Sequence, residues 1–365
     1  MSEWQTFCLK DLGKIVGGAT PSTNNPKNYG NKIAWITPKD LSTLQGRYIK
    51  KGSRSISRLG FKSCSCVLLP KHAILFSSRA PIGYVAIAKK RLCTNQGFKS
   101  IIPNKKIYFE FLYYLLKYHK DNISNIGGGT TFKEVSGATL GLFEVKIPPT
   151  YYEQQKIART LSILDQKIEN NHKINELLQT LAYKIYEYYF KYKPKNAKLE
   201  QIIIENPKSN IMVKNAQKTQ DKYPFFTSGD NILSYPKAII DGRNCFLNTG
   251  GNAGIKFYVG KASYSTDTWC ICANEFSDYL YLLLSSIKTH INQSFFQGTS
   301  LKHLQKNLLK KYPICMPSVH EIKKFNQIMM PLLTLISINT RTSKKLEQIR
   351  DFLLPLLLKQ QVKPK

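Results

Sequence analysis

The side chains best suited to chemistry in this sequence are amides, hydroxyls and guanidinium groups in short glycine-containing loops, such as Thr94-Asn95-Gln96-Gly97 and Thr227-Ser228-Gly229. In the DNA major groove each base pair presents its own pattern of hydrogen-bond donors and acceptors, and these groups match such patterns. Lysine, arginine and backbone N–H groups near glycine bind phosphates and so position a protein on the duplex. The loops therefore predict contacts to double-stranded DNA.

The candidate DNA-contacting residues fall into two sets, one in each half of the chain. The first set is Thr20, Ser22, Lys39, Ser78, Arg79, Thr94, Asn95, Gln96, Thr130, Thr131 and Lys133. The second set is Thr227, Ser228, Asn231, Asn248, Thr249, Thr266, Thr299, Ser300 and Lys302. The two sets differ in sequence, as expected of a protein that reads two different half-sites.

The overall charge agrees with a polyanionic partner. The 365 residues include 54 Lys and Arg but only 23 Asp and Glu, so the formal net charge is +31. A surplus of this size attracts nucleic acid. Hydrophobic residues make up 42% of the chain, which is enough to bury cores, and the length predicts two to three domains at roughly 150 residues each.

The sequence shows no motif for covalent chemistry. The segment Gly250–Lys256 has the wrong spacing for a nucleotide-binding P-loop. Pro148-Pro149 lacks the preceding Asp or Asn and the following aromatic residue of an amino-methyltransferase. The six histidines have no metal-ligand spacing, and the few nuclease-like fragments lack an upstream acidic partner. We predict no catalytic residue, no metal site and no cofactor bound by this chain.

The cysteines and the hydropathy pattern bear on the compartment. None of the eight cysteines forms a Cys-x-x-Cys pair, and the two Cys-x-Cys pairs lie in strand-like runs without a nearby histidine. Reduced, buried thiols are typical of cytoplasmic proteins. The start of the sequence lacks signal-peptide features, and no apolar stretch reaches the ~20 residues that span a bilayer. We therefore expect a cytoplasmic location and no membrane contact.

A long-period repeat organises the whole chain. Gly129–Lys133 returns as Gly298–Lys302, and Ile147-Pro148-Pro149 returns as Met316-Pro317-Ser318, both at an offset of 169 residues. Each copy begins with a strand-rich segment full of Gly, Pro, Asn and aromatic residues, and it ends in a long helical pattern after a proline. The sequence therefore predicts two copies of one structural unit.

The two helical patterns, from about residue 151 to 190 and from about 319 to 358, each carry a heptad stripe. We predict that the stripes pair antiparallel, although each helix packing only on its own domain is the alternative. Asn171 and Asn339 would then lie opposite each other, and Pro331 and Pro355 must kink or interrupt the second helix. The predicted pairing residues are Ile157, Leu161, Leu164, Ile168, Asn171, Leu178, Ile185, Met329, Leu332, Ile336, Asn339, Leu346 and Leu353.

The order of motifs resembles the specificity subunits of type I restriction–modification systems. The start of a target recognition domain of that family is similar to Gly17–Ser22 followed by Ile33–Leu41. Further matches in the first copy are Ser77–Gly83, Thr94–Phe98, Ile147–Pro149 and Glu153–Ala158, and those in the second copy are Tyr223–Ser228 and Ser265–Asp267. The copies diverge where Glu153-Gln154-Gln155 becomes Glu321-Ile322-Lys323.

The resemblance implies an α+β fold with two mixed α/β target recognition domains, separated by two long antiparallel coiled-coil helices related by a pseudo-twofold repeat. The expected parts are recognition domain 1 (residues 1–150), a central spacer helix (151–194), recognition domain 2 (195–317) and a C-terminal spacer helix (318–365). Each domain would read one half of a bipartite, asymmetric DNA site.

The resemblance also implies the division of labour. The helices would recruit two methyltransferase (M) subunits, which bind S-adenosylmethionine, and restriction (R) subunits, which use ATP and Mg, would join for cleavage. This chain would bind none of these cofactors. Forty helical residues span about 60 Å, and a DNA turn is about 34–36 Å, so we expect a gap of roughly 5–8 base pairs between half-sites. The alternatives are a self-contained DNA methyltransferase or endonuclease with diverged motifs, a nonspecific DNA-binding scaffold and an RNA-binding scaffold.

Overall fold

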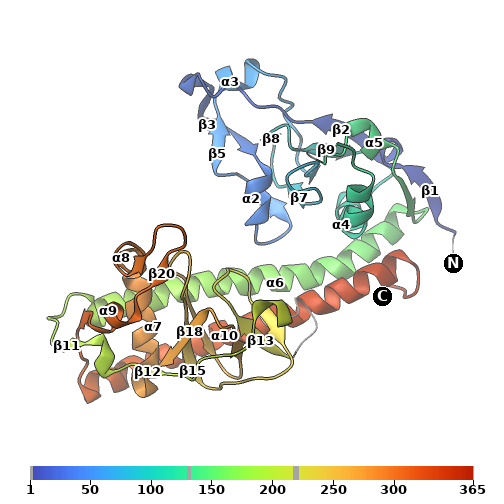
Figure 1. Cartoon of the computed structure of the whole chain (residues 1–365). Helices are drawn as coiled ribbons and strands as arrows, with labels where there is room; N and C mark the ends of the chain where they lie inside the picture. Colours follow the sequence, from blue (N-terminus) through green and yellow to red (C-terminus); the bar gives the residue numbers. More distant parts are fainter. Residues whose placement is uncertain (1–2, 130–132, 217–221, 365) are drawn as a thin grey trace. The chain divides into compact units, whose positions relative to one another are not determined.

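The computed structural model describes residues 3–129, 133–216 and 222–364 (Figure 1). The chain forms two compact units. Unit 1 consists of Met1–Glu169 and Ile349–Lys365, and unit 2 consists of Asn170–Gln348. Each unit therefore contains one globular segment and a stretch of both long helices.

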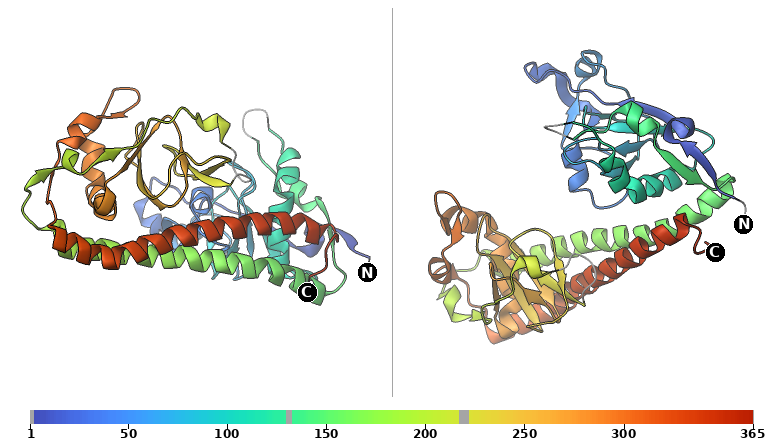
Figure 2. Two further views of the ribbon diagram at one scale, coloured as in Figure 1. Left: turned by 90° about the horizontal axis from the view of Figure 1, so that it is seen from below. Right: turned by 45° about the vertical axis from the view of Figure 1, so that its right-hand side comes forward.

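The two long helices are α6 (Tyr151–Tyr186) and α10 (Val319–Leu358), seen in green and red in Figures 1 and 2. A single π-helical turn, Glu187–Lys191, follows α6. The sequence predicts that Pro331 and Pro355 kink or interrupt the second helix; α10 continues through both prolines, so neither of them interrupts it. Pro331 is exposed, and Pro355 is half-buried.

Both long helices begin with the same capping arrangement. The Thr150 hydroxyl accepts from the Glu153 backbone N–H at 3.2 Å and donates to its carboxylate at 3.0 Å. The Ser318 hydroxyl accepts from the Glu321 backbone N–H at 3.3 Å and donates to its carboxylate at 2.9 Å. This reciprocal cap satisfies backbone donors at the helix start. Because the two caps are 168 residues apart, the repeat extends to the helix boundaries.

Polar contacts between α6 and α10 in unit 2 show that the helices run antiparallel. Asn171 donates to the Ser343 hydroxyl at 3.2 Å, and Asn339 donates to the Asn175 side-chain oxygen at 3.0 Å. Asn175 in turn donates to Thr340 at 3.3 Å. The predicted pairing of Asn171 with Asn339 is therefore wrong. The two observed pairs exchange under the 168-residue repeat, so the pseudo-twofold axis passes between them rather than through one pair of amides.

Apolar packing in each unit has the same antiparallel sense. In unit 1, Ile157 and Leu161 near the start of α6 share a buried cluster with Leu354 and Leu357 near the end of α10. In unit 2, residues at the end of α6 share a buried cluster with Phe325 and others at the start of α10. Every predicted pairing side chain is at least half-buried; Ile157, Leu161, Ile168 and Met329 are fully buried.

The globular part of unit 1 is built on a mostly antiparallel sheet of five strands in the order β2-β9-β6-β7-β4, packed against helix α4. A smaller sheet has the order β5-β3-β8, and β1 pairs with β10. The α-helices and strands are β1 (Gln5–Cys8), α1 (Leu9–Leu12), β2 (Gly13–Gly17), β3 (Tyr29–Ile36), α2 (Pro38–Ser42), β4 (Tyr48–Ile49), β5 (Arg54–Ile56), α3 (Arg58–Lys62), β6 (Ile74–Phe76), β7 (Val85–Ala88), β8 (Cys93–Thr94), β9 (Lys99–Pro103), α4 (Phe109–Asn125), α5 (Gly137–Gly141) and β10 (Glu144–Ile147).

The globular part of unit 2 repeats this plan. Its larger sheet has the order β12-β18-β15-β16, packed against helix α7, and its smaller sheets have the orders β14-β13-β17 and β19-β20, while β11 pairs with β21. The elements are β11 (Ala197–Lys198), β12 (Ile204–Glu205), β13 (Tyr223–Phe226), β14 (Leu233–Tyr235), β15 (Arg243–Asn248), β16 (Ile255–Val259), β17 (Ser263–Tyr264), β18 (Thr268–Cys272), α7 (Ser277–Ser286), α8 (Lys288–Ser294), β19 (Phe296–Gln297), β20 (His303–Leu304), α9 (Lys306–Lys310) and β21 (Pro313–Ile314).

The packing on α6 predicts a large effect of truncating Leu161. This side chain is fully buried, whereas that of Ile163, two residues further on, is 47% exposed. Leu161→Ala should lower the free energy of unfolding by about 2–5 kcal/mol, because it leaves a cavity in the core. The matched variant Ile163→Ala should change it by about 0.5 kcal/mol or less. Urea denaturation followed by circular dichroism measures both, and equal effects would contradict this packing.

Candidate nucleic-acid interface

In unit 1, backbone hydrogen bonds bring together loops that are far apart in the sequence. The N–H of Ala19 donates to the Thr94 carbonyl at 3.0 Å, and the N–H of Ser78 donates to the Gly97 carbonyl at 2.8 Å. The N–H of Val135 donates to the Ser78 carbonyl at 3.0 Å. The segments at residues 19, 78, 94–97 and 135 are therefore held next to one another in this unit.

Unit 2 holds its loops together by equivalent bonds. The N–H of Thr249 donates to the Asp267 carbonyl at 3.2 Å, and the N–H of Leu304 donates to the Thr249 carbonyl at 3.0 Å. The parallel pairing of β13 with β17, which aligns Phe226 with Tyr264, corresponds to that of β3 with β8 in unit 1. The two copies thus share one scaffold, and its loops carry different side chains.

Most of the candidate DNA-contacting side chains reach the surface of this scaffold. The exposed ones are Ser22, Lys39, Gln96, Lys133, Asn231, Thr266, Thr299, Ser300 and Lys302. Those that are half-buried are Thr20, Arg79, Asn95, Ser228 and Thr249. Thr130 and Thr131 lie outside the described residues. Whether these side chains contact DNA stays a prediction.

Four candidates require a correction, because Ser78, Thr94, Thr227 and Asn248 are buried. The Thr227 hydroxyl accepts from the Gly229 backbone N–H at 3.0 Å, which shapes the loop from inside. The side-chain amide of Asn248 likewise donates to a loop carbonyl at 3.1 Å. Ser78 and Thr94 hold neighbouring loops through their backbone groups. These side chains support the surface, and we leave them out of the proposed contacts.

Neighbouring groups orient several of the remaining candidates in unit 1. The Thr20 hydroxyl donates to the side-chain oxygen of Gln96, which links two loops at the surface. The Arg79 guanidinium lies 3.5 Å from the Glu134 carboxylate, which also pairs with Lys99 at 3.2 Å. An exposed amide held by a neighbouring loop is a suitable group for reading a base edge.

Lys256 holds loops of unit 2 together from inside. In the sequence it was noted only as the last residue of a segment with the wrong spacing for a P-loop. Its ammonium group donates to the carbonyls of Thr227 at 2.8 Å and Gly229 at 2.7 Å, and it lies 3.4 Å from the Asn248 side-chain oxygen. Burial lowers the pKa of Lys256. The sequence carried no signal for these contacts, because the carbonyls of Thr227 and Gly229 lie well before Lys256 in the chain.

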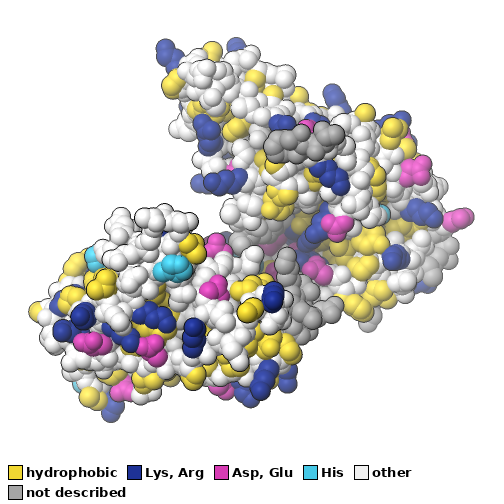
Figure 3. Space-filling view, viewed as in Figure 1, with side chains coloured by type: hydrophobic (Ala, Val, Ile, Leu, Met, Phe, Trp, Pro, Cys, Tyr) yellow, Lys and Arg dark blue, Asp and Glu magenta, His cyan; other side chains and the backbone are white. Residues whose placement is uncertain are grey.

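Positive charge is spread over the surfaces of both units, where Figure 3 shows many Lys and Arg side chains. Within residues 3–129, 133–216 and 222–364, no group of three or more His, Cys, Asp and Glu side chains is arranged to hold a metal ion. Among the helices that the structure describes, none combines the length and the apolar character needed to cross a bilayer.

A family comparison decides what the duplicated scaffold is. Residues 1–180 and 195–348 each match the type I restriction modification DNA specificity domain, so the family model covers both copies of the repeat. The chain belongs to this family. It is the DNA-specificity subunit of a type I restriction–modification system, a DNA-recognition subunit rather than an enzyme. This finding supports the main prediction and not the alternative of a self-contained methyltransferase or endonuclease.

Individual relatives agree with this family membership. The chain is 33% identical over 403 residues to the type I restriction enzyme MjaIX specificity subunit of Methanocaldococcus jannaschii, covering 98% of this chain and 93% of the relative. It is 30% identical over 190 residues to the HindI specificity subunit of Haemophilus influenzae, covering 49% and 40%. The crystal structure of a type I S subunit from M. genitalium has the same fold, with a TM-score of 0.63 at 18% identity and coverage of 98% and 96%.

Two adjacent glycines at the candidate interface of the specificity subunit provide a matched test. A Cβ on Gly18 would lie 2.0 Å from the Asn95 carbonyl oxygen and 2.4 Å from that of Thr94, whereas a Cβ on Gly17 would meet no atom within 4 Å. Gly18→Ala should therefore push two interface loops apart and cost about 1–3 kcal/mol of stability.

Gly17→Ala serves as the control and should leave stability unchanged within about 0.5 kcal/mol. Thermal unfolding measures stability, and fluorescence anisotropy with duplex DNA measures binding. We expect Gly18→Ala to weaken both. A Gly18→Ala variant that matches Gly17→Ala in both measurements would show that the loops around residues 18 and 95 do not touch as described.

Proposed function

We propose that the surface loops of unit 1 read one half of a bipartite, asymmetric DNA site and that the equivalent loops of unit 2 read the other half. The observation that carries this proposal is the repeated scaffold with different side chains at equivalent positions. Gln96 in unit 1 corresponds to Thr266 in unit 2, because each lies two residues after the last residue of the equivalent strands β8 and β17; both are exposed. A Gln amide can pair bidentately with adenine, whereas a Thr hydroxyl makes a single bond. The two loops would therefore prefer different bases.

The proposed partners are double-stranded DNA, two methyltransferase (M) subunits and restriction (R) subunits. The helices expose apolar side chains suited to protein partners, including Leu177 at 63% on α6 and Phe352 at 67% on α10. S-adenosylmethionine, ATP and Mg would be bound by those partner subunits and not by this chain. If the chain binds DNA inside the cell together with these subunits, its location would be the cytoplasm.

Sequencing of methylated DNA tests this proposal. The chain is combined with its methyltransferase subunits and a random DNA library, and the modified molecules are sequenced. We expect a motif of two specified halves around an unspecified gap. A single uninterrupted motif would contradict the proposal, and so would methylation that ignores sequence. Methyl transfer by the chain alone would support the enzyme alternative.

Single substitutions should divide the motif between the two units. Gln96→Ala in unit 1 should relax one half of the motif, and Ser300→Ala in unit 2 should relax the other, because both side chains are exposed on candidate loops. Loss of a good base contact costs about 1–3 kcal/mol of discrimination at one position. The same sequencing assay measures the change.

Gln45→Ala is the control for this experiment, because Gln45 is exposed outside the candidate loops. Its motif should equal that of the unmodified chain. If Gln96→Ala changed both halves of the motif, or neither half, the assignment of unit 1 to one half-site through this loop would be wrong.

A further inference from the structure

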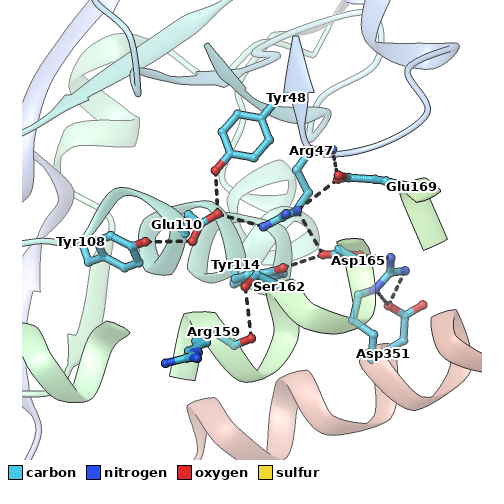
Figure 4. A network of polar contacts seen from close by, with 11 residues as sticks. Arg47, Tyr48, Tyr108, Glu110, Tyr114, Arg159, Ser162, Asp165, Glu169 and Asp351 are labelled. Atoms are coloured by element: carbon cyan, nitrogen blue, oxygen red, sulfur yellow. Dashed lines mark hydrogen bonds and ion pairs between the residues drawn. The ribbon is translucent and has the colours of Figure 1, made fainter. Parts of the chain in front are cut away.

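Arg47 is the most deeply buried arginine in a network that joins the recognition domain of unit 1 to its long helices (Figure 4). Its side chain is only 3% exposed and lies just before β4. The guanidinium pairs with Glu110 of α4 at 2.9 Å and with Glu169 of α6 at 3.1 Å. Its backbone N–H also donates to Glu169, at 2.9 Å. Arg47 thus links helix α4 of its own domain to the long helix α6.

Neighbouring tyrosines fix the Glu110 carboxylate in this arrangement. The hydroxyl of Tyr48 donates to one carboxylate oxygen at 2.6 Å, and the hydroxyl of Tyr108 donates to the other at 2.9 Å. The pKa of each tyrosine is raised, chiefly by burial and also by the bond to Glu110. Glu110 therefore presents its charge to Arg47 in one orientation.

Asp165 extends the same network across α6 to α10 within unit 1. The hydroxyl of Tyr114, on α4, donates to Asp165 at 2.5 Å, and Arg350 of α10 donates to its other oxygen at 2.7 Å. The Arg47 Nε atom lies 3.9 Å from the same carboxylate. One buried carboxylate on α6 is thus shared by groups from the domain and from the second helix.

This network of charged groups opposes movement of the domain on α6 more strongly than apolar packing does. Burial alone would lower the pKa of Arg47, but the neighbouring Tyr114, Glu169 and Glu110 raise it above its ordinary value, so the guanidinium stays charged. A buried charge that loses one partner is left uncompensated. Its hydrogen bonds are also directional. Rotation of the domain on α6 would break several of these bonds at once.

Unit 2 uses the equivalent carboxylate with a different arginine. Asp278 corresponds to Glu110, since each is the second residue of the equivalent helices α7 and α4. Asp278 pairs at 2.6 Å with Arg243, which comes from β15 and also donates to Thr334 of α10 at 3.0 Å. Each unit thus fastens its domain to a long helix through an arginine and this acidic position, although the arginines are not equivalent.

We infer that Arg47 is a positioning residue that fixes the orientation of recognition domain 1 on α6 and so restricts the specificity subunit to one gap length between its half-sites. This inference rests on the proposed bipartite reading. Adding one base pair to the gap moves a half-site by about 3.4 Å along the duplex and by about 35° around it. A domain free to shift on its helix by that amount would accept neighbouring gap lengths.

The test uses the chain assembled with its methyltransferase subunits and a DNA library that keeps both half-sites constant and varies the gap by single base pairs. In Arg47→Met, methylation of the preferred gap relative to its neighbours should fall by about tenfold, a common size of coupling between sites. The half-site sequences should remain unchanged. Arg47→Lys keeps the charge but not the geometry of the guanidinium, so it should restore part of the preference.

Lys50→Met is the matched control, because Lys50 lies three residues after Arg47, is exposed and carries the same charge. The gap preference of this variant should equal that of the unmodified chain. Should Arg47→Met fail to fold, Glu169→Gln decides by the same readout, since it removes one anionic partner and keeps the side-chain shape. A uniform loss of methylation at all gap lengths, with preference intact, would overturn the inference. An unmodified complex without any gap preference would instead overturn the proposed function.

Discussion

The antiparallel pairing of α6 with α10 is the constraint on which both units of this specificity subunit depend. Each unit completes its core with one stretch of each helix, so neither globular segment has its full core without the pairing. Register is set by polar contacts, Asn171 with Ser343 and Asn339 with Asn175, which exchange under the internal repeat. Buried amides in a helical interface cost stability but select one register. A slip of either helix would separate these polar partners and would also disrupt the apolar clusters that the helices share in each unit.

The architecture was predictable from the sequence because its signals are periodic. The 168–169-residue repeat and the heptad stripes indicate two copies and a paired helix directly, since side-chain spacing determines which face of a helix is apolar. Two details were not predictable. Whether Asn171 faces Asn339 or Ser343 depends on where the twofold axis crosses the helices, which spacing alone does not determine. Pro331 and Pro355 do not interrupt α10, which residue type alone did not indicate.

The candidate interface was predictable only at the level of loops. Polar residues in a glycine-rich loop serve either to contact a ligand or to hold the loop, and residue type does not distinguish the two. Thr227 and Asn248 turn inward, where Lys256 bonds to the carbonyl of the first and the amide of the second. The network around Arg47 gave no signal in the sequence, because its members come from four separate segments and meet only after folding.

The most direct measurement of the central claim is the gap length recognised after both helices are lengthened together. Insertion of one heptad after Asn171 and one after Asn339 keeps the apolar faces aligned and adds about 10.5 Å to the pair. We predict that methylated DNA will show the same two half-sites with a longer gap, since the added length equals the rise of about three base pairs. Unchanged half-sites separated by an unchanged gap would contradict it, because the paired helices would then not determine the distance between the recognised sequences.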